Sequence, residues 1–327
     1  MIICNLEMQF NPIRIGTRES QLAVWQATLV KDLLEQNGQD AELIFIKSEG
    51  DIDLVTPLYA MGVQGVFTRS LDAALLNDKI DIAVHSMKDV PVQLPQGLVQ
   101  TAVLSHASHK DILVFNSSLA NENVQKLKDG QNLTAIPHSS TSLTIATSSI
   151  RRKAQWLHRF PDTAIENLRG NVNTRLRKVA ESNWDGAIFA AAGLERIQVR
   201  PENGIDLDWM LPAPAQGAIM VVSRQNDNRA LEACVPLNDE STAICVKIER
   251  DFLSGLMGGC STPISALASM VDDKVFFRGN IVSPDGKESV EVEQLFLLDS
   301  IPSAGAKAAQ MILEKGGDRI IEKLKHA

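Results

Sequence analysis

The segment 146–178 concentrates groups that can bind an anion. It carries eight basic residues and two acidic ones, in a chain of 327 residues whose formal net charge is -8. Arg151 and Arg152 follow the sequence Thr-Ser-Ser at 147–149, which we interpret as the turn between a short apolar strand and a helix. At such a turn, hydroxyl groups, free backbone N–H groups and the positive end of the helix dipole converge. A guanidinium donates two parallel hydrogen bonds to a carboxylate, so the pattern favours a carboxylate ligand.

Two further turns have the same character. Arg169 and Gly170 follow an expected strand end at Leu168, and Arg175 then lies on a helix. Arg18 stands at the start of another expected helix. The alternative is that these arginines are solvated surface residues, as isolated charges and basic helix faces usually are. Two Arg-bearing strand-to-helix turns within one short segment favour the binding site.

Lys88 and Asp89 are candidates of a second kind, because they directly follow the apolar stretch 80–85. We predict that this stretch is a buried parallel strand, and ligands of open α/β sheets bind beyond the carboxyl ends of such strands. A carboxylate at position 89, in a region suited to anions, would face a cation or a developing cation on the ligand. The alternative is a turn held together by a Lys–Asp salt bridge.

Cys260 stands in the run Gly-Gly-Cys-Ser-Thr-Pro at 258–263. Two glycines let the backbone approach another group closely and present the thiol on a tight loop. An isolated cysteine is usually a small buried hydrophobe. The flanking residues make an exposed attachment point or nucleophile a competing interpretation, and residue chemistry alone leaves both open.

The stretch 48–67 contains glycines and a proline and lacks a regular apolar period. A loop of this length in a compact domain is usually functional, so we interpret it as a lid. Phe67 at its end is either part of that lid or a core residue.

The surrounding pattern predicts an α/β fold of two lobes with a small α+β C-terminal domain. A strand, a helix and a strand at 13–18, 20–34 and 42–47 begin the first lobe. An apolar strand at 217–222 returns to that lobe, so more than one connection crosses between the lobes, as in hinged ligand-binding pairs. The predicted domains are the first lobe at 1–105 and 217–236, the second lobe at 106–216, and the C-terminal domain at 237–327, with strands at 275–282 and 290–298 and a closing helix at 304–325.

Composition excludes several classes of protein. The 40 acidic residues outnumber the 32 lysines and arginines, which argues against general nucleic-acid binding. No apolar run approaches the length of a membrane span, and the N-terminus lacks the basic and apolar regions of a secretory signal. The four cysteines have no metal-ligand spacing, so we predict no metal site and a cytoplasmic protein with free thiols.

Six runs of residues together resemble a known family. They are RIGTRES, DIAVHSMKDVP, TSSIRRKAQ, LRGNVNTRL, AGLERI and GGCSTP, and they occur in order between Arg14 and Pro263. This set is similar to the signature blocks of the hydroxymethylbilane synthases, also called porphobilinogen deaminases, of tetrapyrrole (haem) biosynthesis. The resemblance implies two lobes like those of type II periplasmic binding proteins, and a third domain that carries a cofactor loop.

The resemblance also implies an activity and a cofactor. The family joins four porphobilinogen molecules head to tail, releases an ammonia at each step, and frees the linear tetrapyrrole by hydrolysis. It primes this chain on a dipyrromethane cofactor bound through a thioether to a cysteine, which matches Cys260. Loss of ammonia leaves a delocalised cation on the substrate, and the catalytic aspartate of the family matches Asp89. We predict a monomer whose partner is its small-molecule substrate, with neither nucleic acid nor a membrane as a partner.

The remaining residue roles are carried over in the same way. Residues that match the family's cofactor-binding positions are Lys88, Thr147, Ser148, Ser149, Arg151 and Arg152. Residues that match its substrate-binding positions are Arg18, Ser20, Arg169, Arg175, Arg196 and Gln216. The lid positions are Gln64 and Phe67.

The chain departs from the family pattern in the lid and in the crossover. Gln64 stands where a lysine is common, Val55 lies near a usual aspartate, and Ser70 replaces a glutamate. The crossover reads Pro-Ala-Gln-Gly at 214–217 in place of Val-Gly-Gln-Gly. Because lid residues affect access and closure rather than the chemistry, we interpret these departures as variation between lineages.

Two rival classes of function remain open. A two-lobed solute-binding module would need the anion-binding turns but neither Asp89 nor a reactive Cys260. A transferase with a cysteine nucleophile would need a histidine base, and His85 at a strand end is the nearest candidate, although we interpret it as structural.

Overall fold

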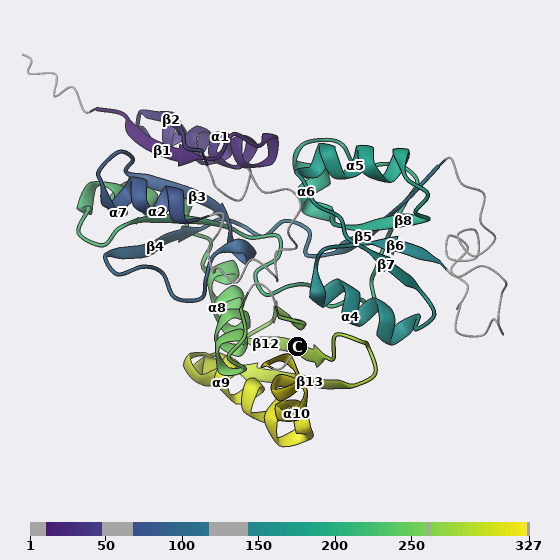
Figure 1. The fold of residues 1–327 in the computed structure, drawn as a ribbon. Coiled ribbons are helices and arrows are strands. Elements are labelled where there is room, and N and C mark those ends of the chain that lie inside the picture. Colours follow the sequence, from purple (N-terminus) through teal and green to yellow (C-terminus); the bar gives the residue numbers. More distant parts are fainter. Residues whose placement is uncertain (1–10, 48–67, 118–142, 260–261, 326–327) are drawn as a thin grey trace, which may run out of the picture.

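The computed structural model describes residues 11–47, 68–117, 143–259 and 262–325. These residues form three sheets with helices packed on them (Figure 1). Two five-stranded sheets form two lobes, and a three-stranded sheet with its helices forms a third domain that lies against both. The predicted class, two α/β lobes with a small α+β domain, is confirmed.

The first lobe is built on a sheet with the strand order β2-β1-β3-β10-β4. β1, β2 and β3 are parallel, and β10 runs antiparallel to both of its neighbours. The core side chains of these strands are mostly isoleucine, valine and alanine, which fill a sheet buried on both faces. The elements of this lobe are β1 (Ile13–Thr17), α1 (Gln21–Gln36), β2 (Ala41–Phe45), α2 (Arg69–Leu76), β3 (Ile82–Ser86), the short 3-10 helix η3 (Met87–Asp89), β4 (Leu98–Val103), β10 (Ile219–Arg224), α7 (Asn228–Cys234) and η5 (Val235–Leu237).

The second lobe repeats this plan with the strand order β7-β6-β8-β5-β9. β6 is parallel to β7 and β8, and β5 runs antiparallel to β8 and β9. The elements of this lobe are β5 (Asp111–Phe115), β6 (Thr144–Ala146), α4 (Ile150–Arg159), β7 (Ala164–Glu166), α5 (Val172–Glu181), β8 (Gly186–Ala190), α6 (Ala191–Arg196) and β9 (Gly204–Asp206).

Two crossover segments, 104–110 and 207–218, connect the lobes and lie side by side. The N–H of Ala107 donates to the carbonyl of Gly217 at 3.3 Å, and the N–H of Leu104 donates to that of Ile219 at 3.0 Å. Gly217 has a φ of +100°, and an added Cβ would lie 2.8 Å from the carbonyl oxygen of Ala107. This close approach therefore requires glycine. The predicted return of the chain to the first lobe is confirmed, with β10 as the returning strand.

The third domain packs α8 (Glu240–Gly255) and α9 (Ile301–Ile312) on an antiparallel sheet. Its core contains the aromatic pair Phe252 and Phe277, whose ring centroids are 5.0 Å apart. The predicted pairing of two strands is confirmed, and a third strand that the sequence analysis missed precedes them. Its other elements are β11 (Ile264–Val271), β12 (Lys274–Val282), β13 (Ser289–Leu297), η6 (Leu298–Ser300), the π-helical turn η7 (Leu313–Gly317) and α10 (Asp318–Lys325).

Two details of the predicted elements were wrong. The closing helix expected at 304–325 is broken, because Gly316 adopts a φ of 94° between α9 and α10. The strand expected to end at Leu168 ends at Glu166, so Arg169 lies wholly within the turn. The proposed domain limits stay predictions. The lid, with Gln64 and Phe67, lies outside the described residues, as does Cys260.

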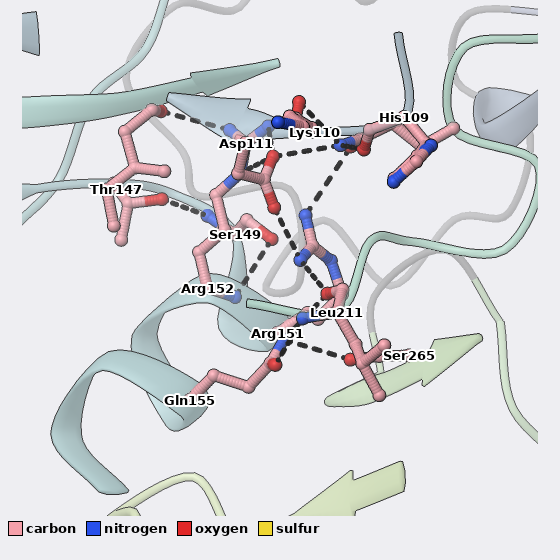
Figure 2. A network of polar contacts seen from close by, with 12 residues as sticks. His109, Lys110, Asp111, Thr147, Ser149, Arg151, Arg152, Gln155, Leu211 and Ser265 are labelled. Carbon is pink, nitrogen blue, oxygen red and sulfur yellow. Dashed lines mark hydrogen bonds and ion pairs between the residues drawn. The ribbon is translucent and has the colours of Figure 1, made fainter. Parts of the chain in front are cut away.

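Buried polar groups connect the third domain to the second lobe and to the crossover. Glu249 on α8 is 2% exposed, and its carboxylate accepts the N–H of Ala215 at 2.6 Å and that of Ala268 at 2.8 Å. Burial raises the pKa of Glu249 to about 8. Gln155 on α4 bonds to both backbone groups of Leu211 and to Ser265 on β11 (Figure 2). The crossover segment 207–218 is thus bonded both to α8 of the third domain and to α4 of the second lobe.

Candidate active site

A cavity of about 300 Å³ lies where the two lobes and the third domain meet. It is lined from the first lobe by the ends of β1 and β3, from the second by the turns before α4 and α5, and from the third domain by residues beside Cys260. All the predicted site residues within the described ranges line it, namely Arg18, Ser20, Lys88, Asp89, Thr147, Ser148, Ser149, Arg151, Arg152, Arg169, Arg175, Arg196 and Gln216.

The turn at 147–149 is the strand-to-helix turn that the sequence predicts. Ser149 is the N-cap of α4, and its hydroxyl accepts the N–H of Arg152 at 3.4 Å. The hydroxyl of Ser148 accepts the N–H of Leu168 at 2.9 Å. This bond ties the turn before α4 to the Arg169 turn, so the two arginine-bearing turns form one wall of the cavity.

Arg151 and Arg152 share a buried counterion, Asp111, at the start of β5 (Figure 2). Arg152 donates from Nε (3.0 Å) and Nη2 (2.8 Å) to Oδ1, and Arg151 Nη1 lies 2.7 Å from Oδ2. Asp111 is fully buried. Burial opposes ionisation of this carboxyl, but the charges of the two guanidiniums outweigh it and hold the pKa of Asp111 well below its usual range. Asp111 was absent from the predicted site.

Arg175 and Arg196 are cations in an environment that disfavours charge. Burial lowers the pKa of Arg175 to about 10, and the charges of Arg152 and Arg169 act in the same direction. Burial also lowers the pKa of Arg196 to about 10. An anion bound beside these two buried guanidiniums would favour their charged forms.

Lys88 and Asp89 face these arginines from the first lobe, on η3 directly after β3. Lys88 Nζ donates to Gln216 Oε1 at 3.2 Å. Burial lowers the pKa of Lys88 to about 8, and the charge of Arg152 acts in the same direction. The charge of Asp89 favours the protonated forms of both Lys88 and Arg175, so this carboxylate acts on cations from both lobes.

Direct contacts between the lobes border the cavity. Asn173 Nδ2, in the first turn of α5, donates to Gln21 Oε1 on α1 at 2.7 Å. The Arg196 guanidinium lies 5.7 Å from the centre of the Trp25 ring, and its Nη2 donates to the carbonyl of Gly217 at 2.6 Å. Arg196 therefore contacts both α1 and the crossover.

The residues on either side of Cys260 reach the same cavity. Gly259 and Thr262 both line it. The Thr262 hydroxyl donates to the carbonyl of Gly259 at 2.7 Å and accepts the N–H of Gly259 at 3.2 Å. Since Cys260 itself lies outside the described residues, its proposed position rests on these two neighbours.

His85, the candidate base of the rival transferase, does not line the cavity. It is buried, and its Nε2 has no hydrogen-bond partner among the described residues. Burial, with a contribution from the charge of Arg18, lowers the pKa of His85 to about 4. Within the described part of the chain no histidine lines the cavity.

Family models match both parts of the chain. Residues 13–232 match "Porphobilinogen deaminase, dipyromethane cofactor binding domain", and residues 243–314 match "Porphobilinogen deaminase, C-terminal domain". The chain belongs to the porphobilinogen deaminase family. The first match spans the strands of both lobes, and the second lies within the third domain.

Curated relatives match over almost the whole chain. The chain is 38% identical over 321 residues to the porphobilinogen deaminase of Syntrophotalea carbinolica, with 97% of each chain covered. It is 38% identical over 320 residues to that of Acidithiobacillus ferrooxidans, with 96% of this chain and 99% of the relative covered. Among solved structures it is similar to the Bordetella pertussis BvgS VFT2 domain, with a TM-score of 0.40 and 12% identity over 72% of this chain and 92% of that one.

None of the helices in the described ranges has the length and apolar character needed to cross a membrane. Nor does that part of the chain gather three or more acidic, histidine or cysteine side chains in a possible metal site.

Proposed function

We propose that this enzyme is a hydroxymethylbilane synthase, which condenses four porphobilinogen molecules on a dipyrromethane bound to Cys260 and releases ammonia and a linear tetrapyrrole. The observation that carries the proposal is the cavity itself. Arginines from both lobes, the carboxylate of Asp89, and Gly259 and Thr262 on the two sides of the Cys260 segment line one space.

The charge of the cavity fits a dipyrromethane. Each pyrrole ring carries an acetate and a propionate, so two rings bring four carboxylates. Burial lowers the pKa values of Lys88, Arg175 and Arg196, so bound carboxylates would stabilise the charged forms of these three groups. Residues that would hold the group are Lys88, Thr147, Ser148, Ser149, Arg151 and Arg152. When bound, the dipyrromethane supplies the pyrrole carbon to which the first substrate ring is joined.

The substrate rings would bind to the remaining cations. Arg18, Arg169 and Arg175 line the cavity beside Ser20, and each guanidinium can donate two hydrogen bonds to one carboxylate. Hydrogen bonds to charged groups are worth about 1.5–3 kcal/mol each, so a few of them hold the anionic chain between additions. Arg196 and Gln216 form hydrogen bonds with the crossover segments. These two side chains would therefore move with the lobes as the bound pyrrole chain grows.

Asp89 would act on the substrate at the step that releases ammonia. Departure of the amine leaves positive charge spread over the ring of the incoming porphobilinogen. An ionised carboxylate fixed on η3 stabilises that charge where it develops, and it can accept a hydrogen bond from the ring N–H. Because η3 is anchored to β3, the carboxylate needs little reorganisation during the reaction.

The test is incubation of the purified protein with porphobilinogen. We expect consumption of substrate, about one ammonia released per substrate consumed, and a product that gives the absorption of a linear tetrapyrrole. Binding of porphobilinogen without ammonia release would overturn the proposal in favour of the solute-binding module. We further propose that the enzyme is a cytoplasmic monomer, which sedimentation of the purified protein and fractionation of cells would test.

Lys88 predicts a dependence of activity on pH. Its pKa of about 8 means that the amine is mostly protonated below that pH and loses its charge above it. Since a neutral amine binds a carboxylate more weakly, we expect kcat/KM for porphobilinogen to fall as the pH rises from about 7 to 9. Lys88→Met should be less active at pH 7 and should lack this alkaline limb. An unchanged limb in Lys88→Met would assign the titration to another group.

A further inference from the structure

Asp111 is a buried carboxylate that lies behind the wall of the cavity. It is 0% exposed and is not among the lining residues, whereas the groups that contact it are. Arg151 and Arg152 reach it from the first turn of α4. Positive charges in the first turn of a helix oppose the helix dipole, so this pair requires a nearby negative charge. Asp111 supplies that charge from inside the protein.

Asp111 also determines the orientation of the two guanidiniums. Arg152 directs Nε and Nη2 to Oδ1 of Asp111 and Nη1 to the carbonyl of Ile188 at 3.0 Å. Arg151 Nη1 donates to the carbonyl of Leu211 at 2.7 Å and forms an ion pair with Oδ2 of Asp111, also at 2.7 Å. The remaining Nε of Arg151 is buried without a hydrogen-bond partner among the described residues.

Through Gln216 the influence of Asp111 reaches the first lobe. Gln216 Nε2 donates to Asp111 Oδ1 at 2.9 Å and to the carbonyl of His109 at 2.8 Å. Because these acceptors fix the amide nitrogen on one side, the amide oxygen points to Lys88 Nζ, 3.2 Å away. The amide cannot be rotated by 180° without facing its oxygen to two acceptors. Asp111 thus orders cations from both lobes.

We infer that Asp111 is a positioning residue, whose carboxylate holds Arg151, Arg152 and, through Gln216, Lys88 in the arrangement that receives the carboxylates of the pyrrole chain. The inference deepens the proposed function and depends on it for the identity of the ligand. The effect of Asp111 on the positions of Lys88 and the two arginines does not depend on which ligand binds.

The first test is Asp111→Asn, which preserves shape and removes the charge. We expect the KM for porphobilinogen to rise about tenfold or more with a smaller change in kcat, the pattern of lost binding. We also expect intact-mass spectra to show a smaller fraction of chains carrying the covalent group. Both readouts should respond because the arginine pair would lose its counterion.

A readout without turnover separates this inference from the proposed function. The rate at which acetic anhydride modifies Lys88, followed by peptide mass spectrometry across pH, reports the titration of that amine. The negative charge of Asp111 favours protonated Lys88, so Asp111→Asn should shift the reactivity curve of Lys88 to lower pH. This shift is expected even if the wild type proves inactive on porphobilinogen.

Asp185→Asn is the matched control, because Asp185 is a buried aspartate of the same lobe that accepts the N–H of Thr144 at 2.8 Å and does not line the cavity. It should lower stability without altering KM, loading or Lys88 reactivity. If Asp111→Asn fails to fold, Asp111→Glu decides, since it retains the charge but displaces it by one methylene. Wild-type KM, loading and Lys88 reactivity in folded Asp111→Asn, or wild-type KM and loading in Asp111→Glu, would overturn the inference.

Discussion

Replacing Asp89 by asparagine is expected to lower kcat by about 10²–10³-fold, the usual effect of removing one fixed group that stabilises transition-state charge. The side chain lines the cavity from η3, and its charge acts on both Lys88 and Arg175. Asparagine keeps the shape of the side chain and can still form hydrogen bonds, but it cannot offset the positive charge left when ammonia departs. Single-turnover measurement of ammonia release from porphobilinogen would report this step directly.

The appropriate control for Asp89→Asn is Asp208→Asn, because Asp208 forms an exposed ion pair with Lys110 at 2.7 Å. That change should leave kcat unaltered, since exposed pairs contribute little. We expect Asp89→Asn to keep the wild-type unfolding temperature and the covalent mass increment, which would show that the loss is chemical. Turnover close to wild type would remove Asp89 from the proposed role.

Replacing Cys260 by alanine is expected to abolish the covalent increment of two pyrrole rings and to reduce tetrapyrrole synthesis by about 10³-fold or more. A tethered primer makes the first condensation intramolecular, and such tethering contributes effective concentrations far above those of free reactants. Intact-mass spectrometry, together with Ehrlich's reagent for linked pyrroles, measures the attachment independently of turnover.

Two buried cysteines provide controls for this experiment. Burial raises the pKa of the Cys234 thiol to about 12 and that of Cys245 to about 11, so neither forms an appreciable thiolate near neutral pH. Cys234→Ala and Cys245→Ala should therefore retain the increment and the activity, apart from effects on stability. An increment that persists in Cys260→Ala, or a wild-type chain without one, would contradict the proposed attachment.

Local signals in the sequence predicted the elements around the site. The Thr-Ser-Ser turn before Arg151 caps α4, and the apolar stretch before Lys88 forms β3, because capping and apolar runs depend on residues that are neighbours in the chain. The same signals placed Arg18 and Arg175 near the starts of two helices, but only the family resemblance implied that the two belong to one site. The structure gathers them around one cavity.

Local sequence patterns could not predict the features that depend on tertiary contacts. Asp111 precedes Arg152 by 41 positions and Gln216 by 105, so no local pattern reveals their contact. Its only sequence signal is an acidic residue at the start of a strand that is otherwise wholly apolar. β11 was missed because its small residues, Ser265, Ala266 and Ala268, carry little strand signal. The break at Gly316 was hidden by helical spacing on both sides.

The position of β10 has a consequence for how the chain folds during synthesis. β10 (Ile219–Arg224) lies between β3 and β4 in the sheet of the first lobe, but in the chain it follows all the strands of the second lobe. During synthesis, the backbone groups of β3 and β4 that pair with β10 therefore lack their partner until this strand leaves the ribosome. The second lobe, whose strands all lie between Asp111 and Asp206, can close its sheet earlier. The nascent chain therefore reverses the usual order, in which the N-terminal unit is finished first.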